Sequence, residues 1–181
     1  MAQVTAVSDS GPLIALTKLG VLSQVLAVYP TLIISEVVYH EVVTSGLALG
    51  AVDATELDKR CRSGQIVIIP SDEIQEVSLD QPAELHHGEL ETIKIALQLS
   101  ADFLFLDDLD ARQVAKENCR KMAAAPAIKG TLGILVELYQ KKLISKAHLK
   151  EHLEAIQRRK DIWISAQLCQ KLIDSLETGV L

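Results

Sequence analysis

The segment ADFLFLDDLDAR, residues 101–112, runs four apolar residues directly into Asp107, Asp108 and Asp110. A short apolar run that ends in acids, followed by a pattern of helical period, is typical of a buried strand leading into a helix. We therefore expect a strand at 102–108. In open parallel sheets, ligands gather beyond the carboxyl ends of the strands. The aspartates thus fall where a functional site is expected.

The same organisation repeats along the chain. Apolar or β-branched runs occupy residues 4–9, 31–35 and 65–70, and a weaker run occupies 123–128. Longer segments of helical period separate them, and after Gly130 the pattern is helical throughout. Continuous apolar strands alternating with helices indicate a parallel sheet covered on both faces. We predict an α/β protein, a three-layer α/β/α sandwich with a central parallel sheet of four to five strands and a helical C-terminal part.

Length and composition narrow the class of protein further. A chain of 181 residues that is 49% hydrophobic is expected to form a single domain, with the helices from about 130 to 181 packed on it. It has no apolar run of about 18 residues and no basic, then apolar, leader at its start, so we expect a cytoplasmic protein that does not enter a membrane. The cysteines are isolated and are expected to be free thiols: Cys61, Cys119 and Cys169.

The charge balance argues against binding nucleic acid by bulk electrostatics, because the net charge is -6. The basic residues are nevertheless uneven, and a group of them lies between positions 141 and 160: Lys141, Lys142, Lys146, Lys150, Arg158, Arg159 and Lys160. This run is either a guide for an RNA backbone or an ordinary helix surface. Aromatic residues make up only 3% of the chain, which argues against a base-stacking platform of the single-strand-binding kind.

The position of each acid along its predicted helix or strand indicates which way its side chain faces. Glu89 shares a helix side with apolar residues, whereas Glu91 falls on a polar stripe with Lys94 and Gln98 and is expected to point to water. Each candidate acid also has a simpler explanation. Glu89 suits a helix N-terminus, Asp9 could cap a helix, and Glu41 could lie on a solvated helix face.

The acids are more informative together than singly. Two different strands end in aspartate, at Asp9 and at the Asp107–Asp108 pair, and capping explains only one acid of that pair. Two helices each bring a glutamate, Glu41 and Glu89, that could face the same edge. Such carboxylates would repel one another without a cation, and Mg²⁺ or Mn²⁺ prefers oxygen ligands. A divalent ion with open water positions can cleave a phosphodiester.

These motifs resemble the PIN domain, the metal-dependent ribonuclease fold of VapC-type toxins, and in particular its PIN-like subfamily that opens with a Ser-Asp-Ser/Thr-x-Pro-Leu-Ile motif. The matching segments are SDSGPLIALTKLG (8–20), IISEVVYHEVV (33–43), GELETIKIAL (88–97), ADFLFLDDLDARQVA (101–115), GTLGIL (130–135) and DIWIS (161–165). Each motif is loose, but their order and spacing together are fairly specific.

The resemblance implies a set of catalytic and metal-binding acids. The family's first acid falls on Asp9, with Ser10 as its hydroxyl neighbour, and its second falls on Glu41 rather than Glu36. The third falls on Glu89. The fourth falls on the adjacent aspartates, both of which are kept as metal ligands with Asp108 preferred, while Asp110 is expected to be an ordinary acid of a first helical turn. The implied set is therefore Asp9, Glu41, Glu89, Asp107 and Asp108.

Further residues have supporting roles in this interpretation. Thr131 resembles a residue near the end of the family's groove, although a helix cap is its simpler role, and Gly11 replaces a small polar residue. We expect His86 and His87 to be solvated rather than to bind metal. The RNA backbone would be guided by Arg112, Lys116, Lys141 and Lys142.

The resemblance implies a divalent-metal-dependent endoribonuclease, with Mg²⁺ or Mn²⁺ as cofactor and RNA as substrate. It also implies the toxin of a toxin–antitoxin pair, with a small antitoxin protein as partner and a homodimer as the assembly. One alternative is a catalytically weak or inactive PIN-fold module that binds nucleic acid or protein. Another is a phosphoryl-transfer or receiver-like domain, which would need Lys129 late in the sheet close to the aspartates.

Overall fold

The computed structural model describes residues 4–80, 85–120 and 122–180. Its centre is a parallel sheet with the strand order β3-β2-β1-β4-β5. The bounds of the strands are β1 Thr5–Ser8, β2 Thr31–Ser35, β3 Ile66–Ile69, β4 Phe103–Phe105 and β5 Ala127–Lys129. The chain thus begins in the middle of the sheet, adds two strands on one side, and then crosses β1 to add two on the other.

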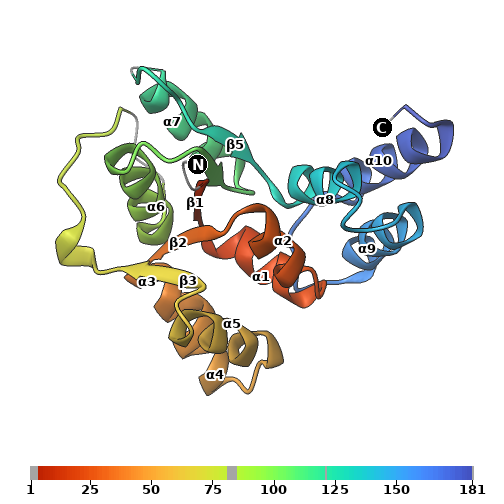
Figure 1. Cartoon of the computed structure of the whole chain (residues 1–181), viewed down its shortest axis with the longest axis horizontal. Helices are drawn as coiled ribbons and strands as arrows, with labels where there is room; N and C mark the ends of the chain where they lie inside the picture. The colour runs from red at the N-terminus through yellow and green to blue at the C-terminus, as the bar shows by residue number, and fades with distance from the viewer. Residues whose placement is uncertain (1–3, 81–84, 121, 181) are drawn as a thin grey trace.

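Helices surround this sheet (Figure 1). Their bounds are α1 Ser10–Lys18, α2 Leu22–Val28, α3 Glu36–Tyr39, α4 Ser45–Ala48, α5 Val52–Arg62, α6 His87–Gln98, α7 Leu109–Cys119, α8 Thr131–Gln140, α9 Lys146–Arg158 and α10 Ala166–Thr178. A π-helical segment, η1 (His40–Thr44), joins α3 to α4, and a 3-10 turn, η2 (Ser71–Glu73), follows β3.

Alternation along the strands divides the interior into two cores, because successive side chains of a strand point to opposite faces. Val7, Ile33 and Leu104 pack with the apolar sides of α6 and α7. Ala6 and Phe105 belong to the larger core on the other face, which α1, α2 and α8 cover. The predicted three-layer α/β/α sandwich is confirmed. The strands are continuous apolar runs because both faces of the sheet are buried.

The fifth strand lies later than its predicted range of 123–128. It begins at Ala127, and residues 123–126 form bends and coil before it. β5 is an edge strand whose register pairs Leu104 with Ile128 and Phe105 with Lys129. Pro126 stands immediately before it, and proline cannot donate a ladder hydrogen bond. The run of small apolar residues was therefore misleading as to where pairing begins.

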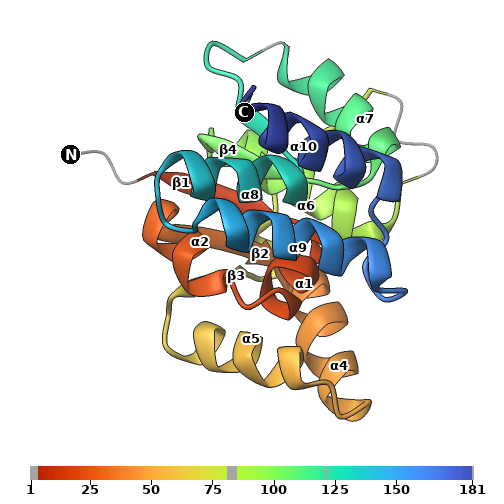
Figure 2. The same cartoon turned by 90° about the vertical axis from the view of Figure 1, so that its right-hand side faces the viewer.

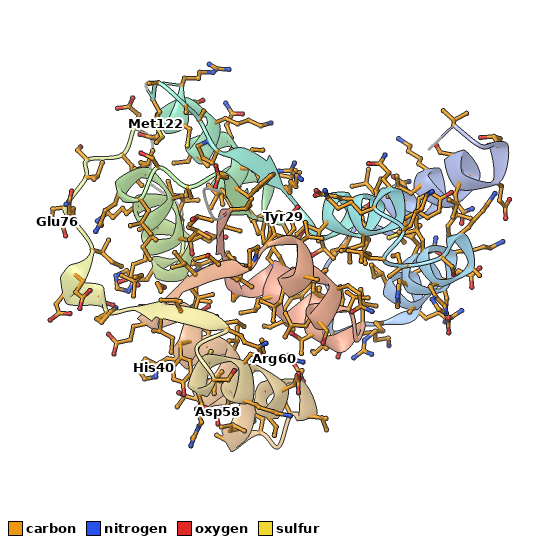
Figure 3. All side chains as sticks on the ribbon, viewed as in Figure 1. Tyr29, His40, Asp58, Arg60, Glu76 and Met122 are labelled. Carbon is orange, nitrogen blue, oxygen red and sulfur yellow. The ribbon has the colours of Figure 1, made fainter. Side chains whose placement is uncertain are left out.

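The C-terminal helices pack on the same side of the molecule as α1, α2 and α8 (Figure 2). Buried residues of α9 and α10, among them Leu149, Leu153 and Ile173, belong to the larger core. Tyr29 lies in the interior between the sheet and α8, with its ring edge-to-face against Phe103 and Phe105 (Figure 3). Among the described residues, no helix has the length and apolar character needed to cross a bilayer.

Two helices that follow strands are capped by a side chain at their start. The Ser35 hydroxyl accepts a hydrogen bond from the Val38 N–H at the start of α3, 3.1 Å away. Asp108 Oδ1 accepts from the N–H groups of Asp110 and Ala111 at the start of α7. Such caps satisfy N–H groups that have no partner within the helix. Both lie at the carboxyl ends of strands, so α3 and α7 start at the sheet edge where Asp9 also lies.

Candidate metal-binding site

Asp9 stands at the carboxyl end of β1, directly before α1, and only 7% of its surface is exposed. Its backbone N–H donates to the Phe105 carbonyl at 3.1 Å, which ties the end of β1 to that of β4. Burial raises the pKa of Asp9 to about 6; the N–H groups of Ser10 and Gly11 oppose this, and Glu89 and Glu41 add to it. A substantial fraction of Asp9 therefore binds a proton at mildly acidic pH unless a cation takes its place.

Glu89 lies in the first turn of α6 and is 8% exposed. Its Oε2 accepts the His86 N–H at 2.9 Å, so one carboxylate oxygen closes the start of the helix as a capping box does. Burial raises the pKa of Glu89; the His86 N–H opposes this, and the charge of Asp108 adds to it. The helix-terminus explanation is thus correct for one oxygen, while the other oxygen is not used by that bond.

Glu41 belongs to the π-helical segment η1 and is exposed at the surface. π-helical turns are rare, and they are frequent at functional sites. A Cβ atom at Gly88 would lie 3.3 Å from Glu41 Oε1, so the missing side chain of that glycine lets the carboxylate approach the start of α6. Glu36, which the sequence argument set aside, instead accepts the Ser71 N–H at 3.3 Å.

These acids meet at one cavity of about 130 Å³ at the sheet edge. Its lining residues are Asp9, Ser10, Glu41, His86, Gly88 and Glu89. No lysine or arginine of the described chain lines this cavity. Three carboxylates from three separate elements therefore share one small space, and the repulsion between them contributes to the raised pKa of Asp9.

The adjacent aspartates differ in their surroundings. Both oxygens of Asp107 accept hydrogen bonds from Thr131, one from its backbone N–H at 2.7 Å and one from its hydroxyl at 2.6 Å. Asp107 thereby caps α8, whose N-cap residue is Gly130 and has no side chain of its own. A Cβ atom at Gly130 would lie 2.8 Å from Asp107 Oδ1. A ligand role for Asp107 stays a prediction, and its observed contacts are structural.

The charge of Asp108 reaches one acid of the candidate site. One of its oxygens caps α7, and its charge raises the pKa of Glu89. Burial raises the pKa of Asp107; the hydroxyl and N–H groups of Thr131 oppose this, and the charge of Arg112 opposes it more weakly. Asp107 also lies close to the start of α1, since a Cβ atom at Gly11 would be 3.8 Å from its Oδ2. The preference for Asp108 as the fourth acid therefore stays a prediction.

Sequence reasoning was wrong about Glu91 and did not identify Gly88. Glu91 is 6% exposed rather than pointing to water, and its Oε2 has no hydrogen-bond partner. The prediction failed because the polar side of α6, which carries Glu91, Lys94 and Gln98, is covered as well as the apolar side. Gly88 could have been found, since a glycine just before a glutamate in a first helical turn allows close approach of another element. His86 and His87 are exposed, as expected, although His86 also borders the cavity.

The residues expected to guide RNA are spread over two parts of the molecule. Arg112 is half-buried one turn into α7, near Asp107, and Lys116 is exposed one turn further on. Lys141 and Lys142 follow the last turn of α8, at the opposite end of that helix from Thr131. Arg112 and Lys116 thus lie on a helix that starts at the carboxyl edge of the sheet, whereas Lys141 and Lys142 do not. A contact of any of the four with RNA stays a prediction.

The donor set fits a hard divalent cation, because it consists of carboxylate oxygens and one serine hydroxyl. The close approach of Glu41 to Gly88 brings one of these carboxylates against the start of α6. As the side chains stand, however, no three His, Cys, Asp or Glu residues within the described ranges are grouped tightly enough to enclose one ion. The site therefore has the charge and the ligand type of a metal centre but an open arrangement.

Comparison with known proteins identifies the class. A family model described as a PIN domain matches residues 5–178. The chain therefore belongs to the PIN-domain family, whose members are generally nucleases and usually use divalent metals. No match was found among curated proteins or among solved structures.

Proposed function

We propose that the protein is a divalent-metal-dependent endoribonuclease that uses Mg²⁺ or Mn²⁺. The observation that carries this proposal is the meeting of Asp9, Glu41 and Glu89 at one small cavity that no lysine or arginine of the described chain lines. Buried carboxylates without a positive partner destabilise a fold, so the presence of Asp9 and Glu89 in this cavity favours a role that needs their charge. The PIN-domain family supplies the nuclease class.

The ion would be held by Asp9, by Glu41 and by the Glu89 oxygen that does not cap α6, with Asp108 adding negative charge beside Glu89. When bound, such an ion supplies a water of lowered pKa and neutralises charge on the phosphate. Burial of Asp9 and Glu89 keeps bulk water from screening this charge. The N–H groups of Ser10 and Gly11 at the start of α1 bond to the Asp9 carboxylate and favour its ionised form, which is the form that binds a cation.

The test is cleavage of single-stranded RNA by the wild type and by Asp9→Asn, with and without Mn²⁺. Asp9→Asn keeps the shape of the side chain and should lower the rate about 100-fold or more, because a charged metal ligand is lost. Asp110→Asn is the matched control, since Asp110 is exposed and lies two residues beyond Asp108. Equal cleavage by Asp9→Asn and the wild type would refute the proposal.

The alternative of a catalytically weak or inactive PIN-fold module is favoured by one observation, the open arrangement of the carboxylates. Absence of metal-dependent cleavage, together with RNA or protein binding, would support it. The receiver-like alternative loses its main residue, because Lys129 bonds to Tyr29 and Glu137 on the far side of β5 from α7. A toxin role, a small antitoxin partner, a homodimer and a cytoplasmic location remain proposals that rest on the family resemblance and the composition.

A further inference from the structure

Trp163, the single tryptophan of the chain, is 91% exposed in the segment between α9 and α10. Its neighbours in sequence point the other way: Ile162 is 6% exposed and belongs to the larger core, and Ile164 packs against that core. The backbone is therefore anchored on both sides of a large aromatic ring that faces solvent. Tryptophan is a residue type enriched where proteins bind partners.

The Trp163 segment is tied to the helix that starts at the candidate metal site. Asp161 accepts two hydrogen bonds from Arg159, at 2.9 and 2.8 Å, and forms a 2.9 Å salt bridge with Lys18. Lys18 is the last residue of α1, and α1 begins directly after Asp9. A helix of nine residues is about 13 Å long, which corresponds to about four stacked nucleotides at ~3.4 Å each.

Positive charge accompanies the ring. Arg158, Arg159 and Lys160 are consecutive and exposed, and they end the basic run that begins at Lys141. Arg158 forms a loose surface pair with Glu154 at 3.8 Å, and Arg159 bonds to Asp161. α9 packs against α8 and runs back along it, so its C-terminal end lies on the side of the molecule where α8 begins (Figure 2). The last three residues of the basic run therefore lie on the same side of the molecule as the carboxyl edge of the sheet, where the acids are. Lys141 and Lys142, at the other end of α8, do not.

We propose that Trp163 is a base-stacking contact for single-stranded RNA, with Arg158 and Lys160 holding the adjacent phosphates. This inference rests on the proposed ribonuclease function and adds a positioning residue away from the metal site. An exposed indole beside cations suits a nucleic-acid strand, because every base offers a flat face for stacking and every phosphate a negative charge. The low aromatic content argued against a platform of several rings. It does not argue against one anchored ring.

Because Trp163 is the only tryptophan, its fluorescence reports binding at this place alone. The full-length Asp9→Asn protein in EDTA should be titrated with a 12-nucleotide oligouridine while tryptophan emission is followed. We expect saturable quenching that weakens as salt rises, and much weaker quenching by duplex RNA of the same length. Unchanged emission while a labelled RNA shows binding by anisotropy would place the RNA elsewhere and overturn the inference, as would no binding at all.

Variants separate stacking from folding. Trp163→Ala should weaken oligouridine binding on the order of ten-fold, and Trp163→Phe should retain most of the affinity because a ring remains. Leu99→Ala, which removes an exposed apolar side chain at the C-terminal end of α6, is the control and should bind as the wild type does. In cleavage assays, Trp163→Ala should raise KM and leave kcat unchanged. Equal affinities for Trp163→Ala and the wild type would overturn the inference.

Charge reversal tests the phosphate contacts. Lys160→Glu should make the slope of log affinity against log salt shallower by about 0.7 for each phosphate that the protein no longer neutralises. Arg120→Glu carries the same charge change at the end of α7 and should leave the slope unaltered. An emission shift with phosphatidylserine vesicles but not with RNA would show a membrane contact and overturn the inference. Absence of cleavage with intact quenching would refute the proposed function alone, so the two failures are distinguishable.

Discussion

Two clusters of ionisable side chains contrast in charge. The cluster on β5 contains a lysine together with an acid, and the cluster at the carboxyl edge of the sheet contains acids that no lysine or arginine of the described chain accompanies. On β5, Lys129 donates to the Tyr29 hydroxyl at 3.1 Å and to Glu137 of α8, and Tyr29 also donates to Glu137. Burial raises the pKa of Glu137, but the bonds from Lys129 and Tyr29 outweigh it and the net shift is downward. At the other cluster, the charges that act most on Asp9 are those of Glu89 and Glu41, and its pKa rises.

The difference between the clusters separates structure from function. Where the chain supplies its own cation, the buried polar groups satisfy one another and rigidify the packing of α8 on β5. Where it supplies acids without a lysine or arginine, the repulsion is left for something outside the chain to neutralise. Burying carboxylates that repel one another lowers the free energy of unfolding, and such a local destabilisation is expected at a functional site.

The largest expected effect concerns the pH dependence of stability at the acid cluster without metal. The pKa of Asp9 is raised in the folded state, so the folded protein binds this proton more tightly than the unfolded chain. The stability from protonated Asp9 is full below about pH 4 and is lost as the pH rises through about 6. In EDTA at pH 7, Asp9→Asn should therefore be more stable than the wild type by on the order of 2 to 3 kcal/mol.

Guanidinium unfolding at pH 4, 5, 6 and 7 measures this, and the advantage of Asp9→Asn should shrink toward pH 4. Asp110→Asn is the control, because Asp110 is exposed. A variant that is less stable than the wild type at pH 7 would mean that Asp9 is held by favourable contacts, and the contrast between the two clusters would fail.

The next effect concerns the Lys129 cluster and has the opposite sign. Lys129→Met keeps the apolar stem but removes the cation that contacts both Tyr29 and Glu137, and leaves Glu137 only the 3.7 Å pair with the more exposed Lys141. It should cost about 2 kcal/mol after discounting for partial exposure. Lys94→Met, which breaks a 3.2 Å pair with the exposed Glu76 labelled in Figure 3, should cost less than about 0.5 kcal/mol. Urea unfolding compares them, and equal costs would contradict the account.

The smallest stability effects distinguish the adjacent aspartates. Asp107→Asn removes one of two acceptors for Thr131 and should cost about 1 kcal/mol, with little change in Mn²⁺ affinity. Asp108→Asn keeps a good N-cap residue, so stability should change by less than about 0.5 kcal/mol, while Mn²⁺ affinity should fall. Unfolding and Mn²⁺ titration of both variants test this. Loss of affinity in Asp107→Asn alone would reverse the assignment.

Sequence reasoning predicted most of the fold because buried parallel strands are continuous apolar runs that alternate with helices of clear period. It located β4 and the start of α7 from ADFLFLDDLDAR, since a strand and a cap are local features, but β4 is Phe103–Phe105 and ends three residues before the predicted end at 108. It placed β5 too early because edge pairing depends on the register with β4.

The candidate site was less accessible to sequence reasoning. The positions of Asp9 and Glu89 followed from their elements, but the hydrogen bonds that separate Asp107 from Asp108 depend on Thr131, which lies 24 residues further along the chain. The burial of Glu91 likewise depends on tertiary packing against α6 rather than on the helical period. The close approach of Glu41 to Gly88 follows from packing of η1 on α6 and has no local signal.

The central claim is that the acid cluster, which no described lysine or arginine lines, binds a divalent cation from solution. Calorimetric titration of the metal-free protein with Mn²⁺ tests this claim most directly. The account predicts saturable binding by the wild type, the same affinity in Asp110→Asn, and at least a ten-fold loss in Asp9→Asn and in Glu89→Gln. Binding of equal affinity in the wild type and Asp9→Asn, or no binding in any of the four proteins, would contradict it.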